Sequence, residues 1–172
     1  MSGPEGSSIK KYRLCVMAFF WRKCMMSDKE YMYQAYLLAK QAYDLDEVPI
    51  GAIIVKDGQI IGRGYNQKEH AHDVSAHAEM LAIHEASQKL GSWHLDGCTL
   101  YSTLEPCMMC SGAIIQSRIS KVIFAVKVSR WDGLSEYLES HQYNHYPQIE
   151  SHILQEECSS LLSNYFKKKR NR

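Results

Sequence analysis

Two short motifs carry side chains that can bind a metal ion and move a proton. His77-Ala78-Glu79 supplies an imidazole and a carboxylate, and Pro106-Cys107-Met108-Met109-Cys110 supplies two thiols. Cys107 and Cys110 are three residues apart, so on a helix both sulfurs lie on one face and can reach the same ion. Thiolate and imidazole ligands together are typical of zinc sites. The sequence therefore predicts that His77, Cys107 and Cys110 bind Zn²⁺.

The number of ligands favours a catalytic zinc over a structural one. A structural zinc normally takes four protein ligands, whereas a catalytic zinc leaves its fourth position to water. The sequence contains one Cys-x-x-Cys pair, which with His77 gives three ligands. Cys98 and His72 are the nearest candidates for a fourth ligand, so a closed structural site is the alternative.

Glu79 is predicted to be the catalytic proton carrier. Zinc lowers the pKa of a bound water from about 16 to about 7, and the hydroxide can attack an sp² ring carbon that bears an amine. A nearby carboxylate can take the water proton and deliver it to the ring nitrogen and then to the leaving ammonia. The alternative for Glu79 is a solvated side chain at a helix start. The order His-x-Glu…Pro-Cys-x-x-Cys is the signature of zinc-dependent base deaminases.

The expected secondary structure places both motifs at helix starts. Ser27 and Glu30 have the spacing of a capping box, and the apolar helical face that follows extends to about Leu45. Strands are predicted at residues 50–55, 59–66, 99–103 and 121–126, the first two joined by an Asp57-Gly58 turn. Further helices are predicted at residues 76–90, 106–117 and 152–168, with irregular structure at residues 67–75 and 127–150. This alternation predicts an α/β fold with helices packed on a central sheet.

Composition indicates one globular domain without an overall nucleic-acid charge signature. The chain has 172 residues, 45% of them hydrophobic, and a formal net charge of +1, so any surface for nucleic acid must be local. The one strongly basic stretch is residues 167–172, which follows Tyr165 and Phe166. These rings could stack on bases while the cations contact phosphates. A solvated, frayed tail is the alternative.

Residues 1–26 are predicted to be a poorly ordered N-terminal extension, and residues 27–172 the zinc deaminase domain. The apolar stretch at residues 14–21 is shorter than the roughly 20 residues that span a bilayer, and no small-residue cleavage site follows it. The six cysteines are irregularly spaced, which argues against a disulfide scaffold. A cytoplasmic protein with reduced thiols and no membrane partner is expected.

From Ser27 to Arg170 the chain resembles the bacterial tRNA-specific adenosine deaminases, which belong to the cytidine deaminase-like zinc deaminase superfamily. The segments that carry the resemblance are residues 47–52, 64–66, 76–79, 103–113, 144–145 and 157–166 with the basic tail. The resemblance implies a three-layer fold with a five-stranded mixed sheet flanked by helices. It also implies a homodimer with one zinc per subunit and active sites near the subunit interface. The implied reaction is an RNA-editing step, the hydrolytic conversion of adenosine to inosine at the wobble position of an arginine tRNA.

The same resemblance implies roles for residues outside the metal site. Asn66 would hydrogen-bond to the flipped base. The residues that would line the base pocket are Val48, Pro49, Ala76 and Leu104, and those that would hold flanking nucleotides are Asn144, Tyr165 and Phe166 with the tail lysines. Ordinary core packing is the alternative for the apolar members of this set.

The chain departs from the family pattern just after the strand at residues 121–126. The family carries an aspartate there, then one residue, then a lysine, whereas this chain has Val128 and Arg130 at those positions. The family aspartate contacts the substrate ribose and backbone, and a valine cannot accept a hydrogen bond. We expect altered or weaker recognition of the anticodon loop, with Asp132 as a possible substitute acceptor and Trp131 as an added stacking surface.

Two other functions are compatible with these residues. A free-base or nucleoside deaminase for guanine or cytosine would use the same zinc chemistry. The basic, aromatic C-terminus argues against it, whereas Val128 argues slightly for it. A non-catalytic, zinc-stabilised RNA-binding module would keep the metal ligands but would show no turnover.

Overall fold

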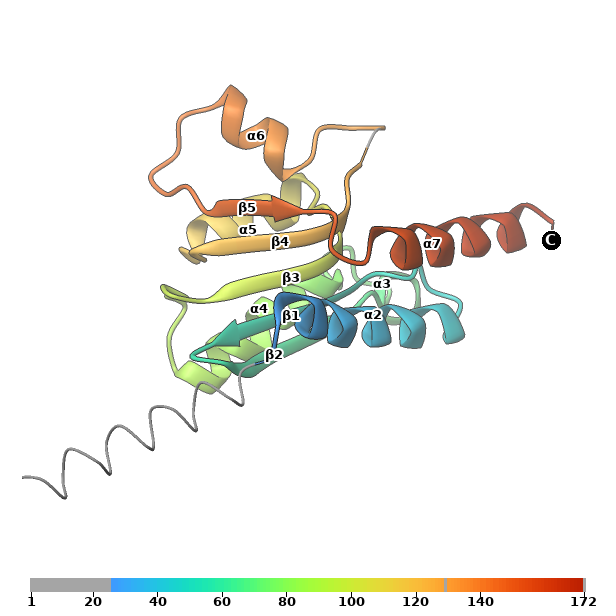
Figure 1. Ribbon diagram of the computed structural model, residues 1–172, viewed down its shortest axis with the longest axis horizontal. Helices are drawn as coiled ribbons and strands as arrows, with labels where there is room; N and C mark the ends of the chain where they lie inside the picture. Colours follow the sequence, from blue (N-terminus) through green and yellow to red (C-terminus); the bar gives the residue numbers. More distant parts are fainter. Residues whose placement is uncertain (1–25, 129, 172) are drawn as a thin grey trace, which may run out of the picture.

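A central sheet of five strands organises the chain (Figure 1). The computed structural model describes residues 26–128 and 130–171. The strands are β1 (Gly51–Lys56), β2 (Gln59–Tyr65), β3 (Thr99–Leu104), β4 (Lys121–Val126) and β5 (Gln148–Ser151). Their order across the sheet is β2-β1-β3-β4-β5, with β1 antiparallel to both neighbours and β3, β4 and β5 parallel to one another. The expected five-stranded mixed sheet is therefore confirmed.

Helices cover both faces of this sheet (Figure 1). They are α2 (Asp28–Asp44), α3 (Lys68–Ala71), α4 (Ala78–Leu90), α5 (Met108–Gln116), α6 (Leu134–Ser140) and α7 (Gln155–Arg170). Successive residues of a strand point to opposite faces, so the sheet carries two cores. Leu100 and Phe124 pack in the core with α4, α5 and the start of α6, whereas Tyr101 and Ile123 pack in the core with α2 and α7. The result is the expected three-layer α/β arrangement.

The first helix of the domain starts at the capping box that the sequence indicates. The Ser27 hydroxyl accepts a hydrogen bond from the backbone N–H of Glu30 at 3.3 Å. The Glu30 carboxylate in turn accepts one from the backbone N–H of Ser27 at 2.7 Å. These two bonds satisfy backbone donors that the first turn of α2 would otherwise leave open.

Three features of the loops differ from the sequence-based expectation. Residues 127–150 were predicted to be irregular, which is wrong, because they contain α6 and the start of β5. The β5 strand has four residues, pairs with β4 at the edge of the sheet, and alternates exposed with half-buried positions, so no apolar run marks it. The predicted loop at residues 67–75 contains the one-turn helix α3.

The predicted N-terminal extension lies outside the described residues, apart from Met26, and stays a prediction. Within the part of the chain that the structure describes, no helix combines the length and apolar character needed to cross a bilayer.

Two glycines allow α4 to lie directly on β2. A Cβ atom at Gly64 would clash with the carbonyl oxygen of Ala78 and would lie 2.8 Å from the amide nitrogen of Ala82. A Cβ atom at Gly62 would clash with the carbonyl oxygen of Ala82 in the same way. This close approach sets how deeply the start of α4, and with it His77, lies against the sheet.

Gly64→Ala is expected to lower the free energy of unfolding by about 2–3 kcal/mol, because backbone atoms of α4 would have to move. Gly112→Ala is the matched control, since a Cβ atom there meets nothing within 4 Å. It should raise stability by about 0.5–1 kcal/mol through helix propensity. Denaturant unfolding at equal zinc loading measures both changes. A Gly64→Ala protein as stable as the wild type would contradict the close packing.

Candidate metal centre and adjoining groove

Three side chains that can bind a metal come together beyond the end of β3. Nδ1 of His77 lies 3.7 Å from Sγ of Cys107 and 3.6 Å from Sγ of Cys110, and the two sulfurs are 3.7 Å apart. A tetrahedral ion about 2.3 Å from sulfur and about 2.0–2.1 Å from nitrogen would separate the sulfurs by about 3.8 Å and each sulfur from the nitrogen by about 3.6 Å. The residues present therefore fit a zinc ion.

The group of possible ligands has three members. Among the described residues, no further histidine, cysteine, aspartate or glutamate joins His77, Cys107 and Cys110. Cys98, a sequence candidate for a fourth ligand, packs instead in the core beneath α4. Three ligands leave one coordination position for water or substrate, as in catalytic zinc sites.

Two helix starts position the ligands. His77 is the N-cap residue of α4, and Cys107 is the N-cap residue of α5, so Cys110 lies in the first turn of α5. Unpaired backbone N–H groups give these helix ends a partial positive charge, which favours thiolates. Both helix starts converge near the C-terminal end of β3, where α/β folds commonly place ligands.

Hydrogen bonds among these three side chains change their pKa values. The pKa of Cys107 is lowered to about 4, first by the hydrogen bond with Cys110 and then by the one with His77. The same contact with Cys107, followed by burial, raises the pKa of Cys110. Hydrogen bonding with Cys107 also raises the pKa of His77. Metal binding displaces the protons that remain, because the ligands of zinc are thiolates and neutral imidazole.

Glu79 is buried next to these ligands. Its side chain is 3% exposed, and the hydroxyl of Ser102 donates to its Oε1 at 3.4 Å. Burial raises the pKa of this carboxyl group. The alternative of a solvated glutamate is therefore wrong. A carboxyl group that is easily protonated and shielded from bulk water suits a residue that accepts and returns a proton.

A second buried carboxylate, which the sequence analysis did not single out, holds Asn66. Nδ2 of Asn66 donates to Oε2 of Glu47 at 3.0 Å, and the backbone N–H of His70 donates to Oε1 at 2.6 Å. A carboxylate only accepts hydrogen bonds, so this contact sets which end of the Asn66 amide faces Glu47. Glu47 could have been found in the sequence as the one acidic residue in the otherwise apolar stretch of residues 47–52.

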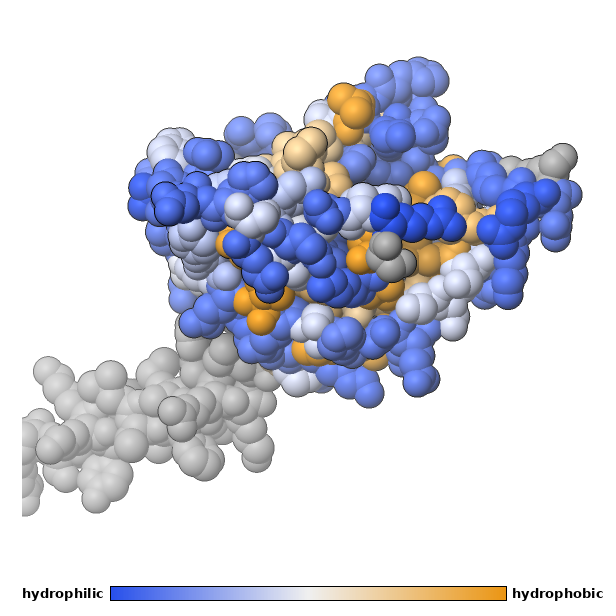
Figure 2. Space-filling model, turned by 90° about the horizontal axis from the view of Figure 1, so that it is seen from above, coloured by the Kyte–Doolittle hydropathy of each residue, from blue (hydrophilic) through white to orange (hydrophobic). Residues whose placement is uncertain are grey.

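A groove with a volume of about 580 Å³ runs between α7 and the ends of β3 and β4. Figure 2 shows hydrophobic surface beside α7, bordered by hydrophilic residues. The predicted residues that line this groove are Val48, Leu104 and Phe166, and its cations are Arg130, Lys167 and Arg170. Val128 and Trp131 also line it. The mixture of apolar, aromatic and cationic side chains suits a single-stranded nucleic acid.

Three other predicted contact residues are not part of this groove lining. Pro49 and Ala76 are buried, Pro49 beside Val48 and Ala76 beside the ligand His77, and their contact with a base stays a prediction. Asn144 precedes β5, and β5 begins beside Lys121 at the start of β4. Asn144 therefore lies at the end of the sheet opposite to Leu104, and a single chain does not bring it to the groove.

Tyr165 and Lys169 attach α7 to the rest of the domain. The hydroxyl of Tyr165 donates to the backbone oxygen of Asp46 at 2.9 Å, and Nζ of Lys169 lies 2.8 Å from Oδ2 of Asp46. The Tyr165 side chain is 5% exposed, so its ring is not placed for stacking on bases, whereas Phe166 is 46% exposed. These contacts hold the helix that forms one wall of the groove.

Comparison with known proteins agrees with this geometry. Residues 25–126 match the family described as the cytidine and deoxycytidylate deaminase zinc-binding region. The chain belongs to this family. The tRNA-specific adenosine deaminase of Bacillus subtilis (strain 168) is 44% identical over 151 residues, which cover 86% of this chain and 94% of that protein. The protein of the same name from Aquifex aeolicus (strain VF5) is 48% identical over 147 residues, 83% of this chain and 97% of that protein.

A solved structure supports the same family assignment for this chain. It is described as coming from biochemical and structural studies of A-to-I editing by tRNA:A34 deaminases at the wobble position of transfer RNA. It matches with a TM-score of 0.74 and 34% identity, over 77% of this chain and 99% of that chain. The cytidine deaminase-like fold is confirmed, and family membership makes this protein a zinc-binding hydrolytic deaminase.

Cys110→Ala is expected to abolish stoichiometric zinc binding, because it removes one of the three ligands that the described residues bring together. Cys98→Ala is the matched control, since this buried thiol packs in the core outside the ligand group. Metal analysis of both purified variants after dialysis gives the zinc content. Full zinc in the Cys110 variant, or loss of zinc from a folded Cys98 variant, would refute the assignment.

Proposed function

We propose that this deaminase converts adenosine to inosine at the wobble position of a tRNA anticodon, with an arginine tRNA as the expected substrate. The observation that carries the proposal is the groove beside the metal centre. It combines Phe166 and Trp131 with Arg130, Lys167 and Arg170. Aromatic rings can stack on splayed bases, and guanidinium and ammonium groups can bind the phosphates between them. The names of the similar proteins support both the base and the RNA.

In the proposed reaction His77, Cys107 and Cys110 hold the zinc ion. When bound, zinc supplies a Lewis acid that lowers the pKa of water. Glu79 would accept a proton from the water and deliver it to the ring nitrogen of the base as the water oxygen bonds to the ring carbon. It would then accept the second proton from the hydroxyl on that carbon and deliver it to the amine, which leaves as ammonia. The Ser102 hydroxyl steadies Oε1 of Glu79 through its hydrogen bond. Burial keeps bulk water from exchanging the proton while Glu79 carries it.

The substrate base is proposed to be flipped out of the anticodon loop and into this site. Asn66, with its amide oriented by Glu47, hydrogen-bonds to the base. Val48, Pro49, Ala76 and Leu104 line the pocket that receives it, and of these Val48 and Leu104 also line the groove. Phe166 stacks on a flanking nucleotide.

We further propose a homodimer with one zinc ion per subunit, located in the cytoplasm. One ligand group among the described residues supports a single zinc per chain. A role for Asn144 at the substrate depends on the second copy, because its own groove lies at the other end of the sheet. Cysteines 98, 107, 110 and 158 are all unpaired, as in a reducing compartment. Residues 27–172 are proposed as the deaminase domain.

The decisive experiment incubates the zinc-loaded protein with an arginine-tRNA anticodon stem-loop that carries adenosine at the wobble position. Inosine is expected in the stem-loop, and no product from free adenosine, guanine or cytosine. Glu79→Gln should keep its zinc and lower turnover by at least about 100-fold, because the proton carrier is lost. Product from a free base alone would indicate a free-base deaminase. Stem-loop binding without turnover in the wild type would indicate a non-catalytic RNA-binding module.

Val128→Asp is expected to raise kcat/KM for the stem-loop by about 3- to 10-fold, the effect of one added net hydrogen bond. The substitution supplies an acceptor in the groove wall, where the valine offers none. Gln88→Glu adds the same charge at an exposed site on α4 and is the control. Steady-state kinetics on the stem-loop measure the change. No gain over the Gln88 variant would show that the chain recognises its substrate without an acceptor at this position.

A further inference from the structure

Glu105 is a buried carboxylate that the proposed reaction does not use. It is 2% exposed and directly precedes Pro106 and the ligand Cys107. Among residues 26–128 and 130–171, no lysine, arginine or histidine forms a salt bridge with it. A buried carboxylate is tolerated only where hydrogen-bond donors compensate for lost hydration. The donors that surround Glu105 therefore indicate what it holds.

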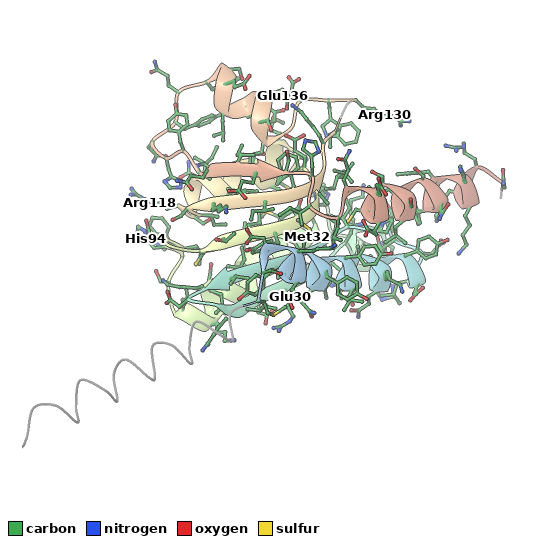
Figure 3. All side chains as sticks on the ribbon, in the orientation of Figure 1. Glu30, Met32, His94, Arg118, Arg130 and Glu136 are labelled. Carbon is green, nitrogen blue, oxygen red and sulfur yellow. The ribbon has the colours of Figure 1, made fainter. Side chains whose placement is uncertain are left out.

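Its donors all belong to the segment between β4 and the start of α6. Oε2 of Glu105 accepts a hydrogen bond from the backbone N–H of Val128 at 3.1 Å. Oε1 accepts one from the backbone N–H of Ser135 at 3.1 Å and one from the Ser135 hydroxyl at 2.6 Å. In sequence, these donors bracket Arg130 and Trp131, which both line the groove. Figure 3 shows Arg130 on this segment, on the same side of the molecule as Glu136 of α6.

Packing against Glu105 is close enough to require a glycine in the segment. A Cβ atom at Gly133 would lie 2.7 Å from both Cγ and Oε2 of Glu105. The φ of Gly133 is −99°, so the restriction is steric and does not come from the backbone conformation. The N–H of Leu134 also donates to the carbonyl oxygen of Pro106 at 3.1 Å. The segment is thus attached to the turn that carries Cys107.

We propose that Glu105 is a positioning residue that clamps Val128 and Ser135 and thereby fixes Arg130 and Trp131, which lie between them in sequence, in the groove wall. This inference rests on the proposed function in one respect, namely that Arg130 and Trp131 contact a nucleic-acid substrate. The backbone of Glu105 leads directly to the zinc ligands, and its N–H donates to the carbonyl oxygen of Val126 at 2.9 Å. One residue therefore sets the position of the groove wall relative to the metal centre.

The clamp acts on binding more than on chemistry. A released segment would spend only part of its time in the arrangement that binds substrate, and the observed affinity falls by that fraction. Glu79 and the zinc ligands make no hydrogen bond to the segment among the described residues, so their arrangement does not depend on it directly. Loss of the clamp should raise KM for the stem-loop and leave kcat largely unchanged.

The test is Glu105→Gln, which keeps the shape of the side chain but replaces one accepting oxygen by an NH₂ group. About a tenfold rise in KM for the anticodon stem-loop is expected, with kcat within about twofold of wild type and zinc content unchanged. Hydrogen exchange in peptides that span residues 127–135 should become faster. Ser135→Ala, which removes one donor, and Gly133→Ala, which displaces the carboxylate, should change KM and exchange in the same direction.

Glu139→Gln is the control, because it removes the same charge from an exposed position of α6. Among the described residues, Glu139 forms no hydrogen bond or ion pair with this segment, and the change leaves Glu105 intact. It should change KM and exchange far less than Glu105→Gln. Unchanged exchange and KM in the Glu105 variant would overturn the clamp, and so would a loss of zinc or of kcat with KM unchanged. If the wild type does not deaminate the stem-loop, the proposed function fails, but the exchange measurement still decides whether Glu105 holds the segment.

Discussion

The structure depends on one geometric demand, that donors from two helices meet around a single ion. His77 caps α4 and Cys107 caps α5, and their donor atoms lie 3.7 Å apart although 30 residues separate them in sequence. A shift of either helix by one ångström would break this arrangement, because zinc–ligand distances vary little. The glycines of β2 let α4 reach the required depth, and the parallel pairing of β3 with β4 fixes the strand from which α5 departs.

Two buried carboxylates hold the segments that surround the metal centre and the groove. Glu47 accepts hydrogen bonds from Asn66 and His70, and Glu105 accepts them from Val128 and Ser135. Glu47 thus connects the segment before β1 to Asn66 and His70, which follow β2. Glu105 connects the end of β3 to the segment between β4 and α6. Hydrogen bonds to an ionised acceptor are short and strongly directional, so they locate a loop more sharply than apolar contacts do. Through Glu105, the groove wall that contains Val128, Arg130 and Trp131 is attached to the strand end that leads to Cys107.

The metal ligands and the proton carrier were easier to predict from the sequence than the residues that surround them. The spacing of Cys107 and Cys110 specifies a shared helix face, and apolar runs mark β1 and β4, so local patterns were sufficient there. The strand β5 was missed because it is short, lies at an edge and owes its existence to pairing with β4. The adjacent Tyr165 and Phe166 looked equivalent in sequence, yet neighbouring helix residues point about 100° apart, and one is buried while the other faces the groove. Such orientations follow from the docking of a whole helix and cannot be read from a window of residues.

The order in which the chain is synthesised gives the attachment of α7 a further meaning. His77, Cys107 and Cys110 are all made before residue 111, whereas α7, which forms one wall of the groove, is made after them. A chain cut short before α7 would still contain every zinc ligand and Glu79 but would lack one wall of the groove. Such a fragment would keep the groups that carry the chemistry but would lose Phe166, Lys167 and Arg170 from the groove. The bonds of Tyr165 and Lys169 to Asp46 therefore attach a groove wall that is made late to a part of the domain that is made early.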